Sequence, residues 1–149
     1  MHKITPFLWY NGLVDEAVAL YTRVFPATTV IATSPGPGGA LMSATLEIEG
    51  QRLILFNGGP MYPLSPAVSL YVNCESQEEV DRLWSQLSEG GAESRCGWLV
   101  DRFGLSWQII PTILPSLLQD PDREKAGRAL KAMLGMSKID IAALERAAG

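Results

Sequence analysis

The stretch CGWLVDRFGLSWQIIP, residues 96–111, has the most informative pattern of this chain. It predicts a short strand, a tight turn at Arg102-Phe103-Gly104 and a second strand that ends at Pro111. It contains two of the four tryptophans, one of the two cysteines and the polar side chain that we expect inside a binding cleft, Gln108. Asp101 comes directly before the turn, and we expect its carboxylate to bond to the local backbone before we consider it as a site acid.

The elements around this hairpin occur twice along the chain. Residues 4–10 predict a strand that Pro6 confines to a sheet edge, and a helix and three further strands follow. The same order starts again near Ala67, and Leu8-Trp-Tyr-Asn11 aligns with Leu70-Tyr-Val-Asn73. The predicted fold class is therefore α+β, with two βαβββ modules and C-terminal helices.

This repeat predicts the domain organisation. Paired modules at about residues 4–58 and 67–111 form one cleft within residues 1–112, and residues 113–149 form a helical extension. In the second module, Ser76 and Glu79 predict a capping box at the start of a helix. Its buried stripe is predicted to be Val80, Leu83, Trp84 and Leu87. In the extension, Asp120 is predicted to cap a helix that has Pro121 at its first position.

Composition excludes several classes of protein. The chain has 149 residues, about a fifth of them charged, and a net charge of −4, which argues against general binding of nucleic acid. No apolar run approaches the roughly 20 residues of a membrane helix, and the N-terminus does not resemble a signal peptide. Two cysteines make no disulfide framework, so we expect a cytoplasmic protein. A single histidine, His2, excludes sites built from several histidines.

The two modules, the CGW, DRFG and SWQ elements and the tail sequence AMLGMSKIDIAALERA together resemble one known family. It is the PhnB-like branch of the vicinal oxygen chelate superfamily, which includes glyoxalase I, extradiol dioxygenases and bleomycin-resistance proteins. This branch often carries the label of a demethylubiquinone methyltransferase domain. The resemblance implies that the modules curl into a cleft, which a homodimer usually completes.

Members of that superfamily that use a metal place one ligand on each of four strands. By strand position these ligands fall at Pro6, at Phe56 or Asn57, near Ala67 with Ser69 next on that face, and at Gln108. Pro6 and Ala67 have no donor side chain, and Asn57 and Gln108 are weak neutral oxygen donors, whereas a tight divalent site requires imidazole, thiolate or carboxylate. We therefore expect a cleft without a metal or other cofactor.

Alternation along the strands predicts which side chains face the cleft. If Gln108 faces the cleft, then Ser106 and Ile110 share its face and Trp107 points to the helices. Leu8 is predicted to face the cleft with Tyr10. The expected ligand-binding residues are Tyr10, Asn57, Ser69, Tyr71, Trp98 and Gln108. The alternative is that several of these residues, Leu8 and Tyr71 above all, simply fill a core. The apolar and aromatic lining with a few neutral polar groups suits a small organic ligand.

Three functions remain open. The first is a metal-free protein that binds a small, largely apolar or aromatic molecule. The second is an enzyme, either a lyase or isomerase with a weakly held divalent metal or one with an unidentified acid–base group. The third is a dimeric structural or regulatory module whose cleft is a relic. Cys96 is a weak candidate for a nucleophile, because neighbouring strand residues such as Arg95 point to opposite faces and no histidine is near.

A methyltransferase is not expected. The common enzymes that use S-adenosylmethionine need a doubly wound sheet with a glycine-rich turn that opens a helix. The glycine-rich stretch of this chain, residues 34–39, has interleaved prolines and joins two predicted strands. We interpret it as a flexible hairpin loop, with a lid over the cleft as the alternative.

Overall fold

A computed structural model describes residues 2–149 of the chain. The chain divides into two compact units, with the boundary between Leu64 and Ser65. Each unit has its own four-stranded sheet. No helix in residues 2–149 is long and apolar enough to cross a membrane.

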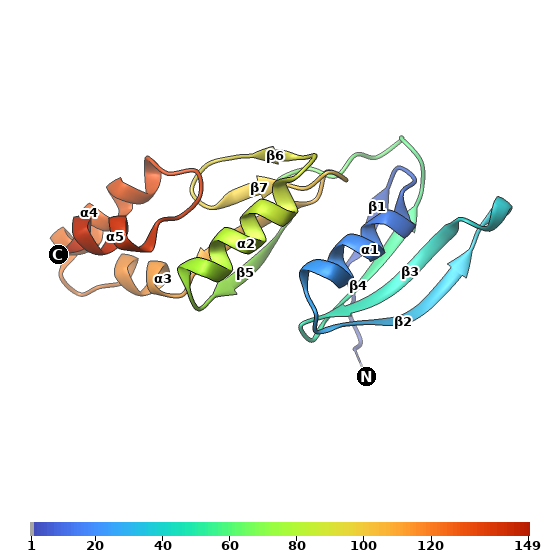
Figure 1. Cartoon of the computed structure of the whole chain (residues 1–149), viewed down its shortest axis with the longest axis horizontal. Coiled ribbons are helices and arrows are strands. Elements are labelled where there is room, and N and C mark those ends of the chain that lie inside the picture. The colour runs from blue at the N-terminus through green and yellow to red at the C-terminus, as the bar shows by residue number, and fades with distance from the viewer. Residues whose placement is uncertain (1) are drawn as a thin grey trace. The chain divides into compact units, whose positions relative to one another are not determined.

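Unit 1 is a sheet with one helix on one face, as Figure 1 shows for its blue and cyan elements. Its strand order is β1-β4-β3-β2, in which β1 pairs with β4 in parallel and the other pairs are antiparallel. The elements in chain order are β1 (Phe7–Tyr10), α1 (Val14–Val24), β2 (Thr28–Pro35), the short helix η1 (Pro37–Gly39), β3 (Leu41–Ile48) and β4 (Gln51–Asn57). The glycine-rich stretch therefore joins two antiparallel strands, as predicted, and Pro6 lies just before an edge strand.

Unit 2 begins with the same topology. Its strand order is β5-β8-β7-β6, again with the first and last strands paired in parallel. The elements are β5 (Ser69–Cys74), α2 (Gln77–Ser88), β6 (Ala92–Glu93), β7 (Trp98–Val100) and β8 (Ser106–Pro111), and then α3 (Ile113–Leu118), α4 (Arg123–Leu134) and α5 (Ile141–Ala148). The predicted α+β class and the repeated βαβββ order are confirmed.

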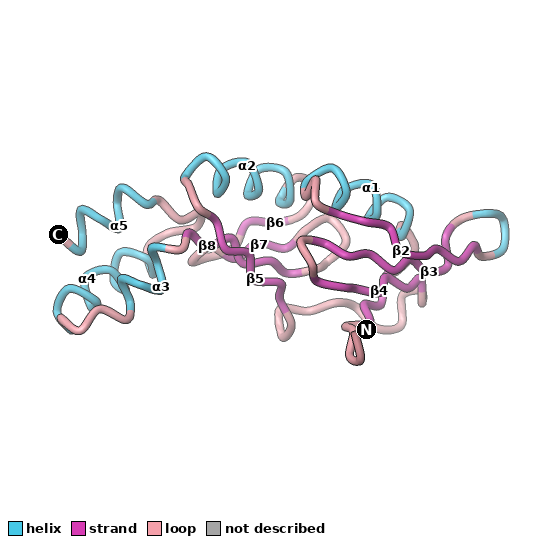
Figure 2. Tube along the Cα trace, turned by 90° about the horizontal axis from the view of Figure 1, so that it is seen from below, coloured by secondary structure: helices cyan, strands magenta, loops and turns pink. Residues whose placement is uncertain are grey.

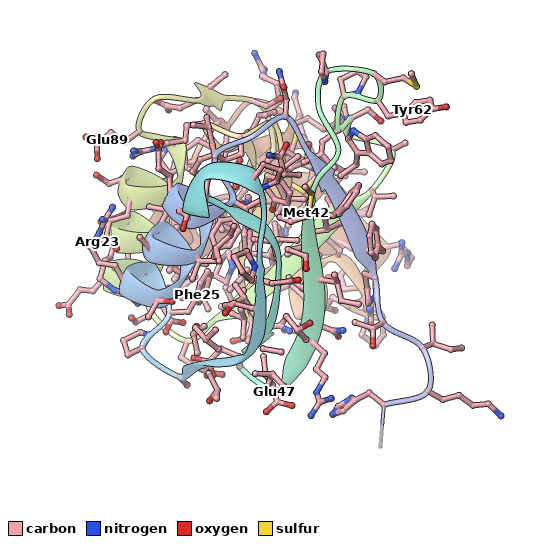
Figure 3. All side chains as sticks on the ribbon, turned by 90° about the vertical axis from the view of Figure 1, so that its right-hand side faces the viewer. Arg23, Phe25, Met42, Glu47, Tyr62 and Glu89 are labelled. Atoms are coloured by element: carbon pink, nitrogen blue, oxygen red, sulfur yellow. The ribbon has the colours of Figure 1, made fainter. Side chains whose placement is uncertain are left out.

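The helices of both modules lie along one side of their own sheets (Figure 2). The buried residues of α1 are Val14, Ala17, Leu20, Tyr21 and Val24, and Val18 is half-buried. Figure 3 shows Arg23 on the outer side of this helix and Phe25, directly after it, between the helix and the sheet. An apolar stripe at helical spacing thus fixes which face of the helix meets the sheet.

The start of α2 follows the predicted capping pattern with one difference. The backbone N–H of Glu79 donates to the hydroxyl of Ser76 over 3.1 Å, as a capping box requires. The Glu79 carboxylate, however, accepts a bond from the N–H of Glu75 rather than from that of Ser76. The four predicted inner residues of this helix are all buried: Val80, Leu83, Trp84 and Leu87.

Two predicted boundaries are wrong. Strand β5 begins at Ser69, and Ala67 lies in the turn before it, where its N–H donates to the Ser65 hydroxyl. In the tail, the cap of α4 is Asp122 rather than Asp120, because Oδ1 of Asp122 accepts the N–H groups of Glu124 and Lys125.

Within unit 2, the tail helices pack against the sheet through a hydrophobic cluster and backbone hydrogen bonds. The N–H groups of Cys96 and Gly97 donate to the carbonyls of Met136 and Ser137, both over 2.8 Å. Both donors have positive φ angles, 59° and 86°, so this turn presents two consecutive N–H groups to the tail. The buried cluster joins β8 to the tail helices and comprises Ile110, Leu114, Leu117, Ala129, Ile139, Leu144 and Ala148.

Candidate functional site

The open face of the sheet in unit 2 carries four of the six predicted binding residues. Residues that pair across neighbouring strands project from the same face of a sheet. The register places Tyr71, Gln108 and Trp98 in one row across β5, β8 and β7. Ser69, Ser106 and Val100 form the adjacent row. Alternation thus puts Ser69, Tyr71, Trp98 and Gln108 together, as predicted.

The polar groups of this face are neutral. Nε2 of Gln108 donates to Oγ of Ser69 over 3.0 Å, a bond between the two rows. The Ser106 hydroxyl is buried, with 1% of the residue exposed, and has no hydrogen-bond partner among residues 2–149. Tyr71 is 49% exposed, and partial burial raises the pKa of its phenol above the ordinary value of 10.0. The face combines two aromatic side chains, one of which carries a phenol, with two serine hydroxyls and one carboxamide.

The opposite face of this sheet belongs to the core. Trp107 and Leu99 pair across β8 and β7, and both are buried on the side of α2. The indole Nε1 of Trp107 donates to Oδ2 of Asp101 over 2.9 Å. Oδ1 of Asp101 accepts the N–H groups of Phe103 and Leu105 over 2.9 and 3.0 Å. Asp101 is therefore the residue that orders the turn, and its oxygens are engaged in the core.

In unit 1 the predicted phase of β1 is wrong. Tyr10 is 1% exposed, and its hydroxyl lies 3.0 Å from the hydroxyl of Tyr21 on α1. Leu8 is also buried on this side, so both residues face the helix rather than an open sheet face. All four residues of β1 are large and apolar or aromatic, and the sequence therefore has no polar position that marks the exposed side.

Asn57 also lies on the helix side of its sheet. It is the pairing partner of Tyr10, and it lies on the same face of β4 as the buried Leu53 and Leu55. Its Oδ1 accepts the N–H of Gly12 over 2.9 Å and so closes the turn between β1 and α1. The amide thus has a structural role, and the prediction that it lines the open face is corrected.

The open face of unit 1 instead carries aromatic residues that were not among the expected binding residues. Phe7 and Trp9 alternate with the buried residues of β1, and both rings contact Phe56, at centroid distances of 5.2 and 5.3 Å. Trp9 also contacts Tyr62 edge-on at 5.0 Å, and its indole donates to the carbonyl of Gly59. The period-two spacing of Phe7 and Trp9 was the available signal.

The donors present do not fit the metal site of the superfamily. Pro6 and Ala67 carry no donor, Asn57 is engaged with Gly12, and Gln108 offers a neutral amide. Within residues 2–149 no group of three or more His, Cys, Asp or Glu side chains could hold a metal ion. Burial, with a smaller contribution from the Glu79 carboxylate, raises the pKa of the Cys74 thiol to about 12. Cys74 is therefore also a poor ligand, because a thiol binds metal as the thiolate.

Cys96 lacks the surroundings of a nucleophile. The guanidinium of the adjacent Arg95 donates to the carbonyl of Leu134, at the end of α4. Cys96 precedes β7 in a turn and does not start a helix. The structural role of Cys96 lies in its backbone, because its N–H donates to the carbonyl of Met136 in the tail.

Comparisons with known proteins agree with this architecture. Residues 2–110 match the family described as 3-demethylubiquinone-9 3-methyltransferase. A Bacillus cereus PhnB protein, described as of the 3-demethylubiquinone-9 3-methyltransferase type, is 30% identical with a TM-score of 0.69, and the match covers 74% of this chain and 99% of that one. Protein PA1353 from Pseudomonas aeruginosa is 25% identical with a TM-score of 0.61, over 74% of this chain and 98% of its own. No curated protein sequence matches significantly.

A more distant structure shares the fold. The fosfomycin resistance protein FosX from Listeria monocytogenes, solved with Mn(II) and sulfate, is 16% identical with a TM-score of 0.54, over 72% of this chain and 90% of that one. The repeated βαβββ topology, the match over residues 2–110 and the likeness to the Bacillus cereus protein all point the same way. This chain belongs to the 3-demethylubiquinone-9 3-methyltransferase family, the PhnB-like branch of the vicinal oxygen chelate superfamily.

Proposed function

We propose that this protein binds a small, largely apolar or aromatic organic molecule on the open face of the unit 2 sheet, without a metal. The observation that carries the proposal is the row of Tyr71, Gln108 and Trp98, with the Ser69 hydroxyl bonded to Gln108. Two aromatic side chains that flank a few neutral polar groups are typical of sites for uncharged organic ligands.

The side chains at the metal-ligand positions support binding without a metal. A neutral amide binds divalent transition metals weakly in comparison with imidazole, thiolate or carboxylate. At the superfamily's ligand positions in unit 2, Gln108 could coordinate only through its neutral amide oxygen, which is a weak donor for such metals. The weak donor at this position favours a binding protein over a lyase or isomerase that uses a metal.

A methyltransferase activity has no support in this fold. The sheet of each unit is mixed rather than doubly wound, and the glycine-rich residues 34–39 connect β2 to β3. They contain only the three-residue helix η1 and lead into strand β3, so they open no α-helix toward a cofactor. The family description is a name of the family, and we do not assign its reaction to this chain.

Metal analysis tests the proposal directly. Untagged protein should contain no stoichiometric metal, and its melting temperature should stay unchanged when nickel, zinc, manganese or iron(II) is added. A stoichiometric metal in the wild-type protein, or a shift of several degrees, would overturn the metal-free proposal and favour the enzyme.

We also propose that the protein forms a homodimer. Unit 1 exposes large apolar side chains that a second copy could cover, among them Ile4 at 88%, Met61 at 70% and Tyr62 at 59%. Light scattering after size exclusion, across a tenfold range of protein concentration, should give twice the chain mass of 16.2 kDa. A single mass of one chain throughout that range would contradict the proposal.

A further inference from the structure

We propose that Ser69, Ser106 and Gln108 form a neutral triad on the sheet face of unit 2. The triad forms hydrogen bonds with a donor and an adjacent acceptor on a planar ring, such as a lactam or a cyclic imide. This inference deepens the proposed function, because it names the chemical class of the ligand for the same sheet face. It rests on that function being correct.

The Ser106 hydroxyl lacks a hydrogen-bond partner among residues 2–149, which points to a ligand. Leaving a buried hydroxyl without a partner is costly, so buried polar groups are nearly always bonded. The hydroxyl of Ser106 is buried and has no partner among residues 2–149. Its strand position pairs it with Ser69, and both project from the face that carries Gln108. We infer that a ligand which enters between the side chains of this row, and so reaches the covered hydroxyl, supplies the missing acceptor.

The second argument is the direction of the remaining hydrogen bonds. Oγ of Ser69 accepts from Nε2 of Gln108, which leaves the hydroxyl proton of Ser69 to donate outward. Oε1 of Gln108 is the acceptor that the amide offers to a ligand, and Nε2 keeps one further N–H beside it. The triad thus offers two hydroxyl donors beside one amide acceptor. Its complement is a carbonyl next to an N–H.

The third argument is the absence of charge. The rows of this face are Ser69, Ser106 and Val100, then Tyr71, Gln108 and Trp98, and they contain no ionisable group except the tyrosine phenol. A tyrosine phenol is neutral at neutral pH already with its ordinary pKa of 10.0. Bringing a carboxylate or phosphonate here would remove its hydration without a compensating cation. The expected ligand is therefore uncharged.

The flanking rings set the shape of the ligand. Neighbouring strands lie about 4.8 Å apart, so the backbones at Tyr71 and Trp98 are separated by roughly 10 Å with Gln108 between them. A flat ring that stands over Gln108 can then contact an aromatic side chain on each side. Its edge, rather than its face, would meet the triad.

The experiment is calorimetric titration of the full chain with four related probes. They are 2-quinolinone, which has the lactam, 1-methyl-2-quinolinone, which lacks its N–H, quinoline, which lacks the carbonyl, and quinoline-2-carboxylate, which is charged. We expect 2-quinolinone to bind best, the two neutral analogues about threefold to tenfold more weakly, and the anion more weakly still.

Variants of the triad test whether the preference for 2-quinolinone depends on its side chains. Ser106→Ala should weaken 2-quinolinone about threefold to tenfold and leave quinoline unchanged. Its melting temperature should not fall, since the hydroxyl has no partner in the protein. Gln108→Met, which keeps the length of the side chain, should abolish the preference for the lactam over its methylated form. Ser94→Ala, an exposed serine of the same unit, is the matched control and should change nothing.

The outcomes separate the two proposals. Equal affinity for the three neutral probes, or an unchanged affinity of Ser106→Ala, would overturn the triad while leaving apolar binding intact. Tightest binding of the anion would overturn the neutral class. If no probe binds, both the triad and the proposed function are wrong.

Discussion

A β-carbon added to Gly97 would lie 2.7 Å from Cδ1 of Ile110, inside van der Waals contact. It would also lie 3.0 Å from the carbonyl oxygen of Ile109 and 3.2 Å from Cγ1 of Ile139. Gly97 therefore lies where the strand β8 and the tail come together. The CGW element owes its glycine to this packing and to the positive φ of 86°.

Gly97→Ala should lower the free energy of unfolding by about 2–4 kcal/mol, because a left-handed backbone and an overpacked contact both oppose the new methyl group. Urea denaturation followed by tryptophan fluorescence measures the change. Gly127→Ala is the matched control. Gly127 lies within α4 with open space around the added carbon, so alanine there should stabilise by about 0.5–1 kcal/mol. Equal effects of the two changes would contradict the packing described here.

Asp101→Asn should destabilise the protein by about 2–4 kcal/mol. Oδ2 of Asp101 accepts from the indole of Trp107, and an amide nitrogen in that place would put two donors against each other in the core. Thermal and urea unfolding measure this effect. Asp140→Asn provides the comparison, because Asp140 caps α5 and asparagine caps a helix about as well as aspartate. A similarly small effect at both positions would show that the Asp101 bond to Trp107 contributes little.

The two cysteines should differ in reactivity. Burial keeps Cys74 as a thiol, with its pKa raised to about 12, whereas Cys96 is only half-buried. With an aromatic disulfide reagent at pH 8, we expect one fast thiol per folded chain and a second only on unfolding. The Cys96→Ser variant should lose the fast phase. A fast phase that survives in this variant would show that Cys74 is accessible.

The same thiol should make stability depend on alkaline pH. In the unfolded chain Cys74 loses its proton around its ordinary pKa of 9.0, whereas in the folded chain it keeps the proton up to about 12. The unfolded state therefore binds fewer protons in this window, and the free energy of unfolding falls as the pH rises above 9. Urea titrations from pH 8 upward should show a shallower fall for Cys74→Ala than for the wild-type protein.

Gln77→Ala should loosen the attachment of the tail. The Gln77 amide donates to the carbonyl of Ile139 over 3.0 Å and accepts the N–H of Ile141 over 2.8 Å. Losing both partly buried bonds should cost about 1–3 kcal/mol and speed hydrogen exchange in α5. Gln86→Ala, in the same helix, removes an oxygen that is buried without a partner among residues 2–149, so it should be neutral or stabilising. Unchanged exchange in α5 of Gln77→Ala would contradict this role.

The sequence predicted unit 2 better than unit 1, and the reason is physical. In β8 the order Ser-Trp-Gln-Ile places polar and apolar residues in turn, so the alternation itself shows that Trp107 and Gln108 face opposite ways. In β1 the residues Phe-Leu-Trp-Tyr are apolar or aromatic on both faces. There the burial of Tyr10 depends on its contact with Tyr21, a tertiary contact that period-two spacing does not contain.

Other differences have similar causes. Ala67 precedes the strand because the Ser65 hydroxyl turns the chain locally, although apolar residues follow directly. The capping role fell to Asp122 because both Asp120 and Asp122 are plausible caps, and only the bonds formed in three dimensions choose between them. The helix stripe of α2 was predicted fully, since its apolar and polar faces are cleanly separated in the sequence.

The pairing of first with last strand has a consequence for synthesis on the ribosome. In unit 1, Phe7 pairs with Ile54, so the sheet cannot close until β4 has been made. In unit 2 the delay is longer, because the buried cluster around Ile110 also requires Ile139 and Leu144. Since chains emerge from the N-terminus, unit 1 can complete its fold while unit 2 still exposes apolar surface. The nascent chain should therefore need protection by chaperones mainly while its second half is being made.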